Sequence, residues 1–307
     1  MKKFVLKVLL FFACVVVMDF AFGWFFSYLR AHAKGGSTAN CEYIANWCQD
    51  DIIILGSSRA THHYVSQIIA DSLGVTGYNC GEEGNGIVLA YGRFKMLTSR
   101  YRPKLIIYEM TPGFDYGTKD PNTKYLGYLR PYYWKEGIKS IFADFDDDLS
   151  YIKMMSKMYQ NTAKLFPNLL DNLTYRDNLQ GYAPLYGEYA ISKEHEPVVV
   201  KEEKPIIDSL KLSYVEQLIV EAKNDSIPLV FMISPKYETE ISIKSYEPEI
   251  DLCKEYGIPL FNFLNYRGIA ENQTYFQDVS HLNNNGAITY TQMLVKDVLG
   301  KIIKESN

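Results

Sequence analysis

The stretch DIIILGSSRAT, residues 51–61, decides the fold of this chain. Its run of apolar residues, mostly β-branched, is typical of a strand that is buried on both faces of a parallel sheet. Gly56 ends the run, and Ser57 and Ser58 form a turn before a helix predicted at 59–73. A strand that leads directly into a helix in this way predicts an α/β domain.

Similar apolar runs recur along the chain and alternate with helical patterns. The runs lie at residues 75–80, 105–108, 229–233 and 259–263, and the helical patterns lie at 87–100, 207–223, 247–256 and 283–304. Alternation of this kind predicts a parallel sheet with helices on both faces, a three-layer α/β/α sandwich. We therefore expect residues 51–307 to form one such domain.

The interval 111–205 interrupts the alternation and is rich in tyrosine. It separates two predicted strands by far more than the usual connection of about 2 to 6 residues. We interpret it as an insertion that covers the carboxyl ends of the strands, where open α/β sheets bind ligands. The alternative is a subdomain that only supports the sheet.

The first 29 residues read MKKFVLKVLLFFACVVVMDFAFGWFFSYL. The apolar stretch is long enough for a bilayer, which takes about 20 residues per helix. We expect residues 1–33 to be an uncleaved membrane anchor, since the apolar core of a signal peptide has only about 7 to 15 residues. A cleaved signal peptide remains the alternative, because Ala31 and Ala33 resemble a cleavage site. The polar residues 34–50 predict a linker.

Charges refine the expected topology and the expected partners. Lysines precede the apolar stretch, which places the N-terminus in the cytoplasm and the large domain on the extracytoplasmic side. Asp19 interrupts the span and is either a contact to a partner membrane protein or a tolerated acid. The net charge of −4, without a basic stripe, argues against a nucleic-acid partner.

The five cysteines show no metal-binding spacing such as C-x-x-C. We therefore expect no zinc site and no other cofactor. Export would permit disulfides, and Cys41 and Cys48 are close enough in sequence to pair.

Two short segments carry residues suited to nucleophilic catalysis. Ser58 lies on the strand-to-helix turn, where its own N–H at a helix N-terminus could stabilise an oxyanion. In FQDVSHLNNNGA, residues 276–287, Asp278 and His281 directly precede the last predicted helix. A serine nucleophile needs such an imidazole as base and such a carboxylate to orient it. Each segment taken alone also fits an ordinary helix cap.

Together the segments resemble the SGNH or GDSL-like hydrolase family over residues 50–307. The matching positions are Gly56 and Ser58 in the first block, Asn79, Gly81 and Gly84 of YNCGEEGNG (residues 78–86) in the second, and Asp278, His281, Leu282, Asn283 and Gly286 in the last. The resemblance implies the SGNH fold, Ser58 as nucleophile, His281 as base and Asp278 as its orienter. It also implies the N–H groups of Ser58 and Gly84 as oxyanion donors.

The same resemblance extends to membrane-anchored envelope members of the family, which have a similar N-terminal anchor. It implies an esterase or O-acyltransferase that acts on acyl esters of a cell-envelope polysaccharide, with water or a sugar hydroxyl as acceptor. Three further residues, Arg59, His63 and Asn85, are weaker candidates for substrate contact.

Two departures from the family pattern are visible. Ser57 replaces the usual Asp before the nucleophile, as in envelope members that act in teichoic-acid D-alanylation. The segment IIYEMTPGFDY, residues 106–116, lacks the Asn that normally supplies a further oxyanion donor. Loss of one such donor typically costs about 10² to 10³ in rate. The alternative function is therefore a non-catalytic glycan-binding or assembly protein of the envelope with the same fold.

Overall fold

The computed structural model describes residues 1–117, 123–146, 149–173, 178–190, 206–237 and 243–305. They form two compact units, which are described separately. Unit 1 consists of Met1–Trp47 and Asn122–Asp177, and unit 2 consists of Cys48–Pro121 and Asn178–Asn307.

Unit 2 is built on a five-stranded parallel sheet with the order β2-β1-β3-β4-β5. The strands are β1 (Ile52–Gly56), β2 (Gly77–Asn79), β3 (Leu105–Glu109), β4 (Leu229–Ile233) and β5 (Leu260–Asn262). Each coincides with one of the apolar runs. The predicted α/β class is therefore confirmed.

Helices cover both faces of this sheet. One face packs on α4 (Ser66–Leu73) and α14 (Asn284–Leu294), whose apolar side chains join alternate residues of β1, β3 and β4 in one core cluster. The opposite face is covered by α5 (Ile87–Thr98) and α12 (Ser209–Asn224), which contact β1 and β4 respectively. This alternation follows from the two-residue repeat of strand side chains.

Two predicted helices are interrupted in the structure. The one expected at 59–73 is divided into α3 (Ser58–His63) and α4, because Tyr64 and Val65 take extended backbone angles. The last one consists of α14, a π-helical turn η5 (Val295–Leu299) and α15 (Gly300–Glu305). The remaining elements of unit 2 are α6 (Pro112–Asp115), η2 (Leu179–Gly181), η3 (Ile243–Tyr246), α13 (Glu247–Tyr256) and η4 (Gln273–Tyr275).

Unit 1 is helical and begins with α1 (Lys2–Ala31), the one helix in the described ranges long and apolar enough to cross a membrane. Most of the predicted linker is instead a helix, α2 (Gly36–Asn46). Its polar composition suggested a loop, but the segment contains no proline, so nothing in it stops a helix. The other helices are α7 (Thr123–Leu129), η1 (Arg130–Tyr132), α8 (Ile138–Phe145), α9 (Ser150–Lys153), α10 (Lys157–Thr162) and α11 (Leu165–Leu173).

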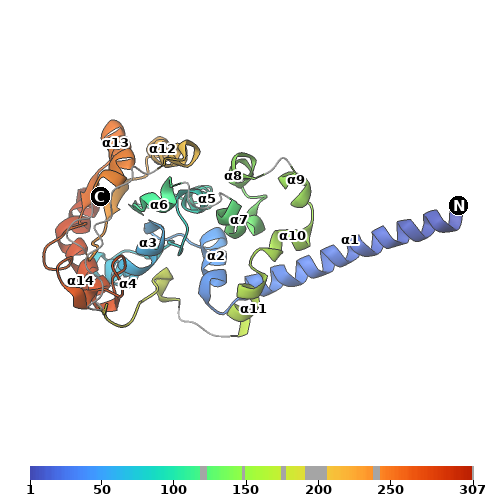
Figure 1. Ribbon diagram of the computed structural model, residues 1–307, viewed down its shortest axis with the longest axis horizontal. Coiled ribbons are helices and arrows are strands. Elements are labelled where there is room, and N and C mark those ends of the chain that lie inside the picture. The colour runs from blue at the N-terminus through green and yellow to red at the C-terminus, as the bar shows by residue number, and fades with distance from the viewer. Residues whose placement is uncertain (118–122, 147–148, 174–177, 191–205, 238–242, 306–307) are drawn as a thin grey trace. The chain divides into compact units, whose positions relative to one another are not determined.

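The second half of α1 packs within unit 1, whereas its first half extends away from the other helices of that unit (Figure 1). The packing is close at Gly23, where a Cβ would lie 2.5 Å from the Cβ of Lys157. Arg30, near the end of α1, forms an ion pair of 2.9 Å with Glu42 of α2. Cleavage after Ala31 or Ala33 would therefore remove a packed part of unit 1.

Asp19 has its partners inside the chain. Its carboxylate accepts hydrogen bonds from the Ser156 hydroxyl and from the backbone N–H of Lys157 at 2.8 Å and Met158 at 3.3 Å. These groups lie at the N-terminus of α10, where unpaired N–H groups favour a negative charge. Asp19 therefore caps α10, and a partner protein is not needed to satisfy its carboxylate.

The predicted insertion is divided between the units. Residues 122–177 cluster with the N-terminal segment, whereas residues 111–121 and 178–205 belong to unit 2. Of this insertion, residues 118–122, 147–148, 174–177 and 191–205 lie outside the described residues. All five cysteines are free, so a Cys41–Cys48 disulfide is not formed.

Candidate active site

The turn between β1 and α3 places Ser58 at the first position of α3. Gly56 has a φ of 141°, a conformation that side chains rarely adopt. A Cβ at this glycine would lie only 2.8 Å from the carbonyl oxygen of Glu109. Glycine therefore allows the chain to turn next to β3 and to present Ser58 at the carboxyl edge of the sheet.

The structure brings Ser58, His281 and Asp278 together. The Ser58 Oγ lies 2.8 Å from Nε2 of His281, although 223 positions separate them in the sequence. The Nδ1 of the same imidazole lies 2.9 Å from Oδ2 and 3.0 Å from Oδ1 of Asp278. The two segments meet because the ends of parallel strands and the loops after them gather at one edge of a sheet.

The hydrogen bonds determine where the protons lie. A carboxylate only accepts, so Nδ1 of His281 donates to Asp278 and Nε2 is left to accept from the Ser58 hydroxyl. Asp278 Oδ1 also accepts the backbone N–H of Ser280 at 2.7 Å and of His281 at 2.9 Å. Partial burial raises the pKa of Asp278, but these hydrogen bonds outweigh it and hold the pKa below the ordinary value. The carboxylate therefore stays charged.

The proposed oxyanion donors are only partly available in this conformation. The Ser58 N–H donates to Oγ of Ser57 at 2.6 Å, so it already has an acceptor. Gly84 has a φ of 63° and lies in a turn closed by a hydrogen bond from the Asn85 N–H to the Glu82 carbonyl. Asn85 is buried, and its Oδ1 has no hydrogen-bond partner within the described ranges. Roles for Gly84 and Asn85 at the site stay predictions.

Arg59, a predicted substrate contact, points into the interior of unit 2. Its side chain is only 2% exposed, and it forms an ion pair of 2.9 Å with the fully buried Glu109. It also donates to the Tyr246 hydroxyl at 2.7 Å. Burial lowers the pKa of Arg59, but the Glu109 carboxylate more than compensates and keeps the guanidinium charged. Desolvation of a cation requires such a partner, which directs Arg59 inward.

Glu109 ends β3, at the point where the family pattern leads to an oxyanion Asn. Besides Arg59, it accepts the Tyr64 hydroxyl, the backbone N–H of Ser234 at 3.1 Å and the Ser234 hydroxyl at 2.7 Å. An ionised carboxylate has no proton to donate. The Glu109 side chain therefore balances the charge of Arg59 and cannot replace the missing donor.

His63, another predicted substrate contact, is fully buried as well. Burial lowers the pKa of His63, so the ring is neutral. Its Nε2 accepts the N–H of Leu282 at 3.0 Å, and Nδ1 therefore donates to Oγ of Ser234, 2.7 Å away. His63 and Ser234 thus form a hydrogen-bonded chain from Leu282, which follows His281, to the Glu109 carboxylate. The same carboxylate binds Arg59, which follows Ser58.

His62 lies beside the site, although the sequence favoured its neighbour His63 for substrate contact. Its ring stands nearly perpendicular to that of His281, with centroids 5.7 Å apart. Nδ1 lies 2.6 Å from the carbonyl of Ala183, and Nε2 lies 2.8 Å from Oε1 of Glu83. The hydrogen bond from His62 lowers the pKa of Glu83. The pair therefore connects α3 to the loop that contains Gly84.

Residues 182–189 of the insertion lie along both motif segments. The Ala183 N–H donates to the carbonyl of Thr61 at 3.1 Å, just after Ser58 in α3. The Asn284 N–H donates to the carbonyl of Leu185 at 2.7 Å, and the Asn283 side chain donates to that of Gly187 at 2.8 Å. This part of the insertion therefore fixes the loop before α14 against α3.

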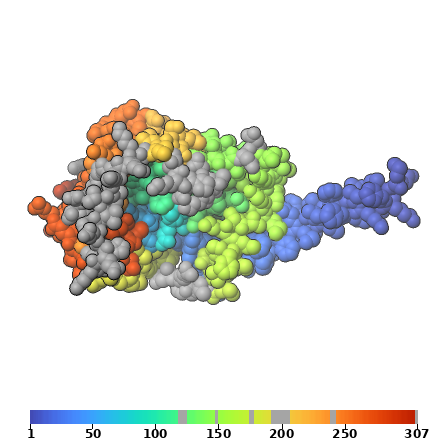
Figure 2. Space-filling view, viewed as in Figure 1, coloured from blue at the N-terminus to red at the C-terminus, as the bar shows by residue number. Residues whose placement is uncertain are grey.

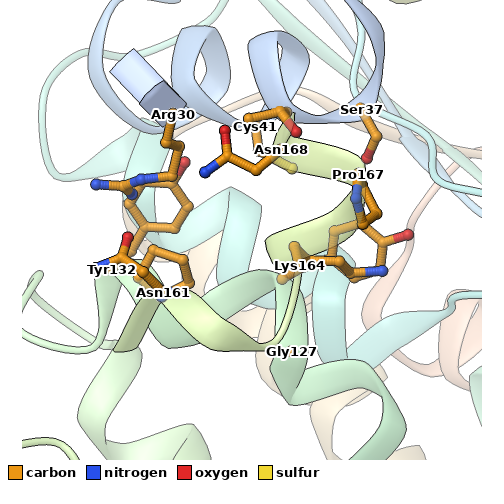
Figure 3. Close-up of a pocket in the computed structure, with 12 residues that line it drawn as sticks. Arg30, Ser37, Cys41, Gly127, Tyr132, Asn161, Lys164, Pro167 and Asn168 are labelled. Carbon is orange, nitrogen blue, oxygen red and sulfur yellow. The ribbon is translucent and has the colours of Figure 1, made fainter. Parts of the chain in front are cut away.

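Other kinds of site have less support in the described residues. Across the described ranges, no group of three or more His, Cys, Asp or Glu is placed to hold a metal ion. A cavity of about 80 Å³ lies in unit 1, near the C-terminal end of α1 (Figure 3). Its lining includes Arg30, which is paired with Glu42, and Lys164, whose Nζ lies 3.4 Å from the centre of the Tyr128 ring. These cations are engaged, and the cavity contains no motif residue.

No family model matches the sequence, and no curated protein matches it. Among solved structures, the chain is similar to a protein from Desulfitobacterium hafniense DCB-2 assigned to the G-D-S-L family of lipolytic proteins. That match has 9% identity and a TM-score of 0.42, and covers 80% of this chain and 98% of the other.

A protein from Bacteroides fragilis NCTC 9343 assigned as an acylhydrolase has 12% identity and a TM-score of 0.43, with 89% and 98% of the two chains covered. An acetyl xylan esterase from the rumen bacterium Butyrivibrio proteoclasticus has 10% identity and a TM-score of 0.34, with 82% and 64% covered. Similarities of this size do not establish membership of a family.

Proposed function

We propose that this protein is a serine-dependent esterase or O-acyltransferase of the SGNH type. The observation that carries the proposal is the continuous set of hydrogen bonds from Ser58 through His281 to Asp278. A hydroxyl, an imidazole and a carboxylate in this order are the parts needed to activate a serine. The substrate class, acyl groups on a cell-envelope polysaccharide, rests on the family resemblance.

The proposed first half-reaction transfers the acyl group to the enzyme. The Ser58 Oγ attacks the ester carbonyl carbon while its proton moves to Nε2 of His281. The carbonyl oxygen becomes an oxyanion, which the N–H groups of Ser58 and Gly84 would stabilise. The Ser58 N–H must first break its hydrogen bond to Ser57 Oγ. The intermediate then collapses, the alcohol leaves with the proton from Nε2, and the acyl group remains on Ser58.

In the second half-reaction an acceptor hydroxyl takes the acyl group. His281 removes its proton as the oxygen attacks the acyl-enzyme, and returns the proton to Ser58 when the bond breaks. Water as acceptor gives hydrolysis, and a sugar hydroxyl gives transfer. His281 and Asp278 are 24% and 49% exposed, so an acceptor from solution can approach them.

We further propose that α1 anchors the protein in a membrane, with unit 2 on the extracytoplasmic side. The apolar side chains of the first half of α1 are exposed, and Lys2, Lys3 and Lys7 precede or interrupt the start of that stretch. Lysines at one end of a span favour the cytoplasmic side. This topology would place Ser58 where envelope polysaccharides are found.

Two observations favour the second candidate, a non-catalytic glycan-binding or assembly protein. The Ser58 N–H is bonded to Ser57, and Glu109 occupies the end of β3 without offering a donor. An enzyme with one oxyanion donor fewer is slower by about 10² to 10³. A protein with this fold could thus retain the serine without appreciable turnover.

Labelling with a fluorophosphonate discriminates between the two candidates. We expect the detergent-solubilised protein to be modified on Ser58, as located by peptide mass spectrometry, because only an activated serine attacks this reagent rapidly. An acetyl ester such as p-nitrophenyl acetate should be turned over, with release of nitrophenol before steady state. Absence of both reactions, in protein with an intact thermal transition, would favour the binding protein.

Asp278→Asn tests the orienting carboxylate. The amide would keep the shape but could present an N–H to Nδ1, which favours the wrong tautomer of His281 and removes the negative charge. We expect kcat/KM for the acetyl ester to fall by about 10² to 10⁴. Asp297→Asn, on the π-helical turn, serves as the matched control and should leave turnover unchanged. Equal rates for both variants would remove Asp278 from the mechanism.

A further inference from the structure

Helix α11 has its apolar face outward. Phe166 and Leu173 are 70% and 78% exposed, and Leu169 and Leu170 are exposed beside them, whereas Asn168 and Asp171 are buried. A surface helix of a soluble domain normally shows the reverse arrangement. The positions 166, 169, 170 and 173 fall on one side of a helix, so the exposed residues form a continuous apolar stripe.

The buried polar face of α11 binds α1 and α2. The Asn168 and Asn172 side chains donate to the carbonyls of Phe26 and Leu29 in α1, at 3.2 and 2.8 Å. Asp171 accepts the backbone N–H of Thr38 in α2 at 3.1 Å. These bonds require the polar face to point inward, and the apolar face is left for another partner.

A second exposed apolar group lies at the level of Asp19, where α1 emerges from unit 1. It consists of Leu149, Tyr151, Ile152, Met155 and Met158 in and around α9 and the start of α10. Figure 2 shows the first part of α1 extending clear of the neighbouring helices of unit 1. At about 1.5 Å per residue, residues 2–18 span about 26 Å, slightly less than a hydrocarbon core of about 30 Å.

The charge of these residues also favours a membrane surface as the partner of the exposed apolar groups. Residues 149–173 contain Lys153, Lys157 and Lys164, and their one acid, Asp171, is buried, in a protein whose net charge is −4. Lysines interspersed with exposed aliphatic and aromatic residues are the composition of helices that lie in a membrane interface. Trp24 and Tyr28, exposed on α1, are residue types that concentrate at that depth.

We infer that α9, α10 and α11 form a surface, residues 149–173, that lies in the headgroup region of the bilayer into which α1 inserts. The partner is an anionic phospholipid surface, which accepts the apolar side chains and attracts the lysines. Because α10 binds α1 at Asp19 and α11 binds it at Phe26 and Leu29, α1 must be tilted in the bilayer for both helices to reach the headgroup region. The inference rests on the proposed anchoring by α1 and is independent of the proposed chemistry.

Depth-dependent fluorescence quenching in nanodiscs tests this surface in the full chain. The environment-sensitive fluorophore NBD is attached to Ile152→Cys or Phe166→Cys in a Cys14→Ser, Cys41→Ser background, with phosphatidylcholine and phosphatidylglycerol as lipids. Lipid with a spin label at carbon 5 should quench about half of the emission, since interfacial helices lie about 5 to 10 Å into the headgroup boundary. The same labelled variants in nanodiscs without spin-labelled lipid are the matched control and should keep their full emission.

A fluorophore on Cys14, in a Cys41→Ser chain, tests the anchoring by α1 separately from the membrane contact of residues 149–173. Quenching of Cys14 by lipid labelled deep in the acyl chain, with no quenching of the reporters at Ile152→Cys and Phe166→Cys by the carbon-5 label, would show an anchored protein whose surface faces water, a second copy or another protein. That result overturns the inference. An unquenched Cys14 overturns the anchor and the inference together, while fluorophosphonate labelling of Ser58 reports on the chemistry separately.

Discussion

Ser58→Ala should lower kcat/KM for an acetyl ester by about 10⁴ to 10⁶, because the acyl-enzyme route is lost and only binding and charge stabilisation remain. The side chain is small and partly buried, and its one described side-chain partner is Nε2 of His281, 2.8 Å away. The fold should therefore be retained. Initial rates at low substrate concentration, with circular dichroism of the same sample, would measure both effects.

Ser57→Ala is the matched control for this substitution. Its hydroxyl is buried and accepts the Ser58 N–H, so its removal frees that donor for an oxyanion. We expect at least wild-type turnover from Ser57→Ala in protein that is folded. Comparable rates for wild type and Ser58→Ala would exclude Ser58 as nucleophile and leave the binding protein as the better proposal.

Glu109→Gln should destabilise unit 2 by about 3 to 5 kcal/mol, the usual cost of leaving one charge of a buried pair without its partner. Arg59 would remain buried against a neutral amide, and Tyr64 and Ser234 would lose a charged acceptor. The effect should appear as a lowered midpoint of thermal unfolding in detergent. Asp251→Asn, which breaks an exposed ion pair with Lys254, should change stability by less than about 0.5 kcal/mol.

The double variant Arg59→Met, Glu109→Leu distinguishes a charge effect from a packing effect. Replacing both ions by apolar residues of similar size often costs little, so the double variant should be more stable than Glu109→Gln. If the double variant were the less stable of the two, the hydrogen bonds of Tyr64 and Ser234 rather than the stranded charge would dominate. A Glu109→Gln protein that melts like wild type would contradict the buried pair itself.

The strands could be predicted from the sequence because their signal is local. β1, β3 and β4 are short runs made mostly of Ile, Leu, Val and Met, and burial on both faces requires such runs. The edge strands β2 (GYN) and β5 (LFN) are shorter and have a weaker signal. The Ser58–His281 contact was also predictable, although the residues are far apart, because Gly56–Ser58 and Asp278–His281 each adjoin an element whose place in a parallel sheet is constrained.

The orientation of Arg59 and His63 could not be predicted in this way. Both follow the serine on a helix start, where solvent and interior are equally near, and the direction is decided by Glu109 on another strand. The one signal was the acid at the end of the apolar run LIIYE, residues 105–109. A carboxylate there implies a buried cation, but the sequence does not name it.

The packing of unit 1 could not be predicted from the sequence, for a different reason. Its helices are short and depend on contacts between α1 and residues 149–173, more than 100 positions later. Helix α11 even shows the correct amphipathic period, but the period does not reveal which face is buried. Only the bonds of Asn168 and Asp171 determine that the polar face lies inside.

The large separation of Ser58 and His281 has a consequence for biosynthesis. Ser58 is among the first residues of unit 2 to be synthesised, but the imidazole that would activate it follows 223 positions later. Contacts so distant in sequence form late in folding. If Ser58 is the nucleophile, a nascent or interrupted chain carries an unreactive hydroxyl, and ester chemistry begins only after the final helix has docked. The order of synthesis would thereby protect the cell from premature deacylation.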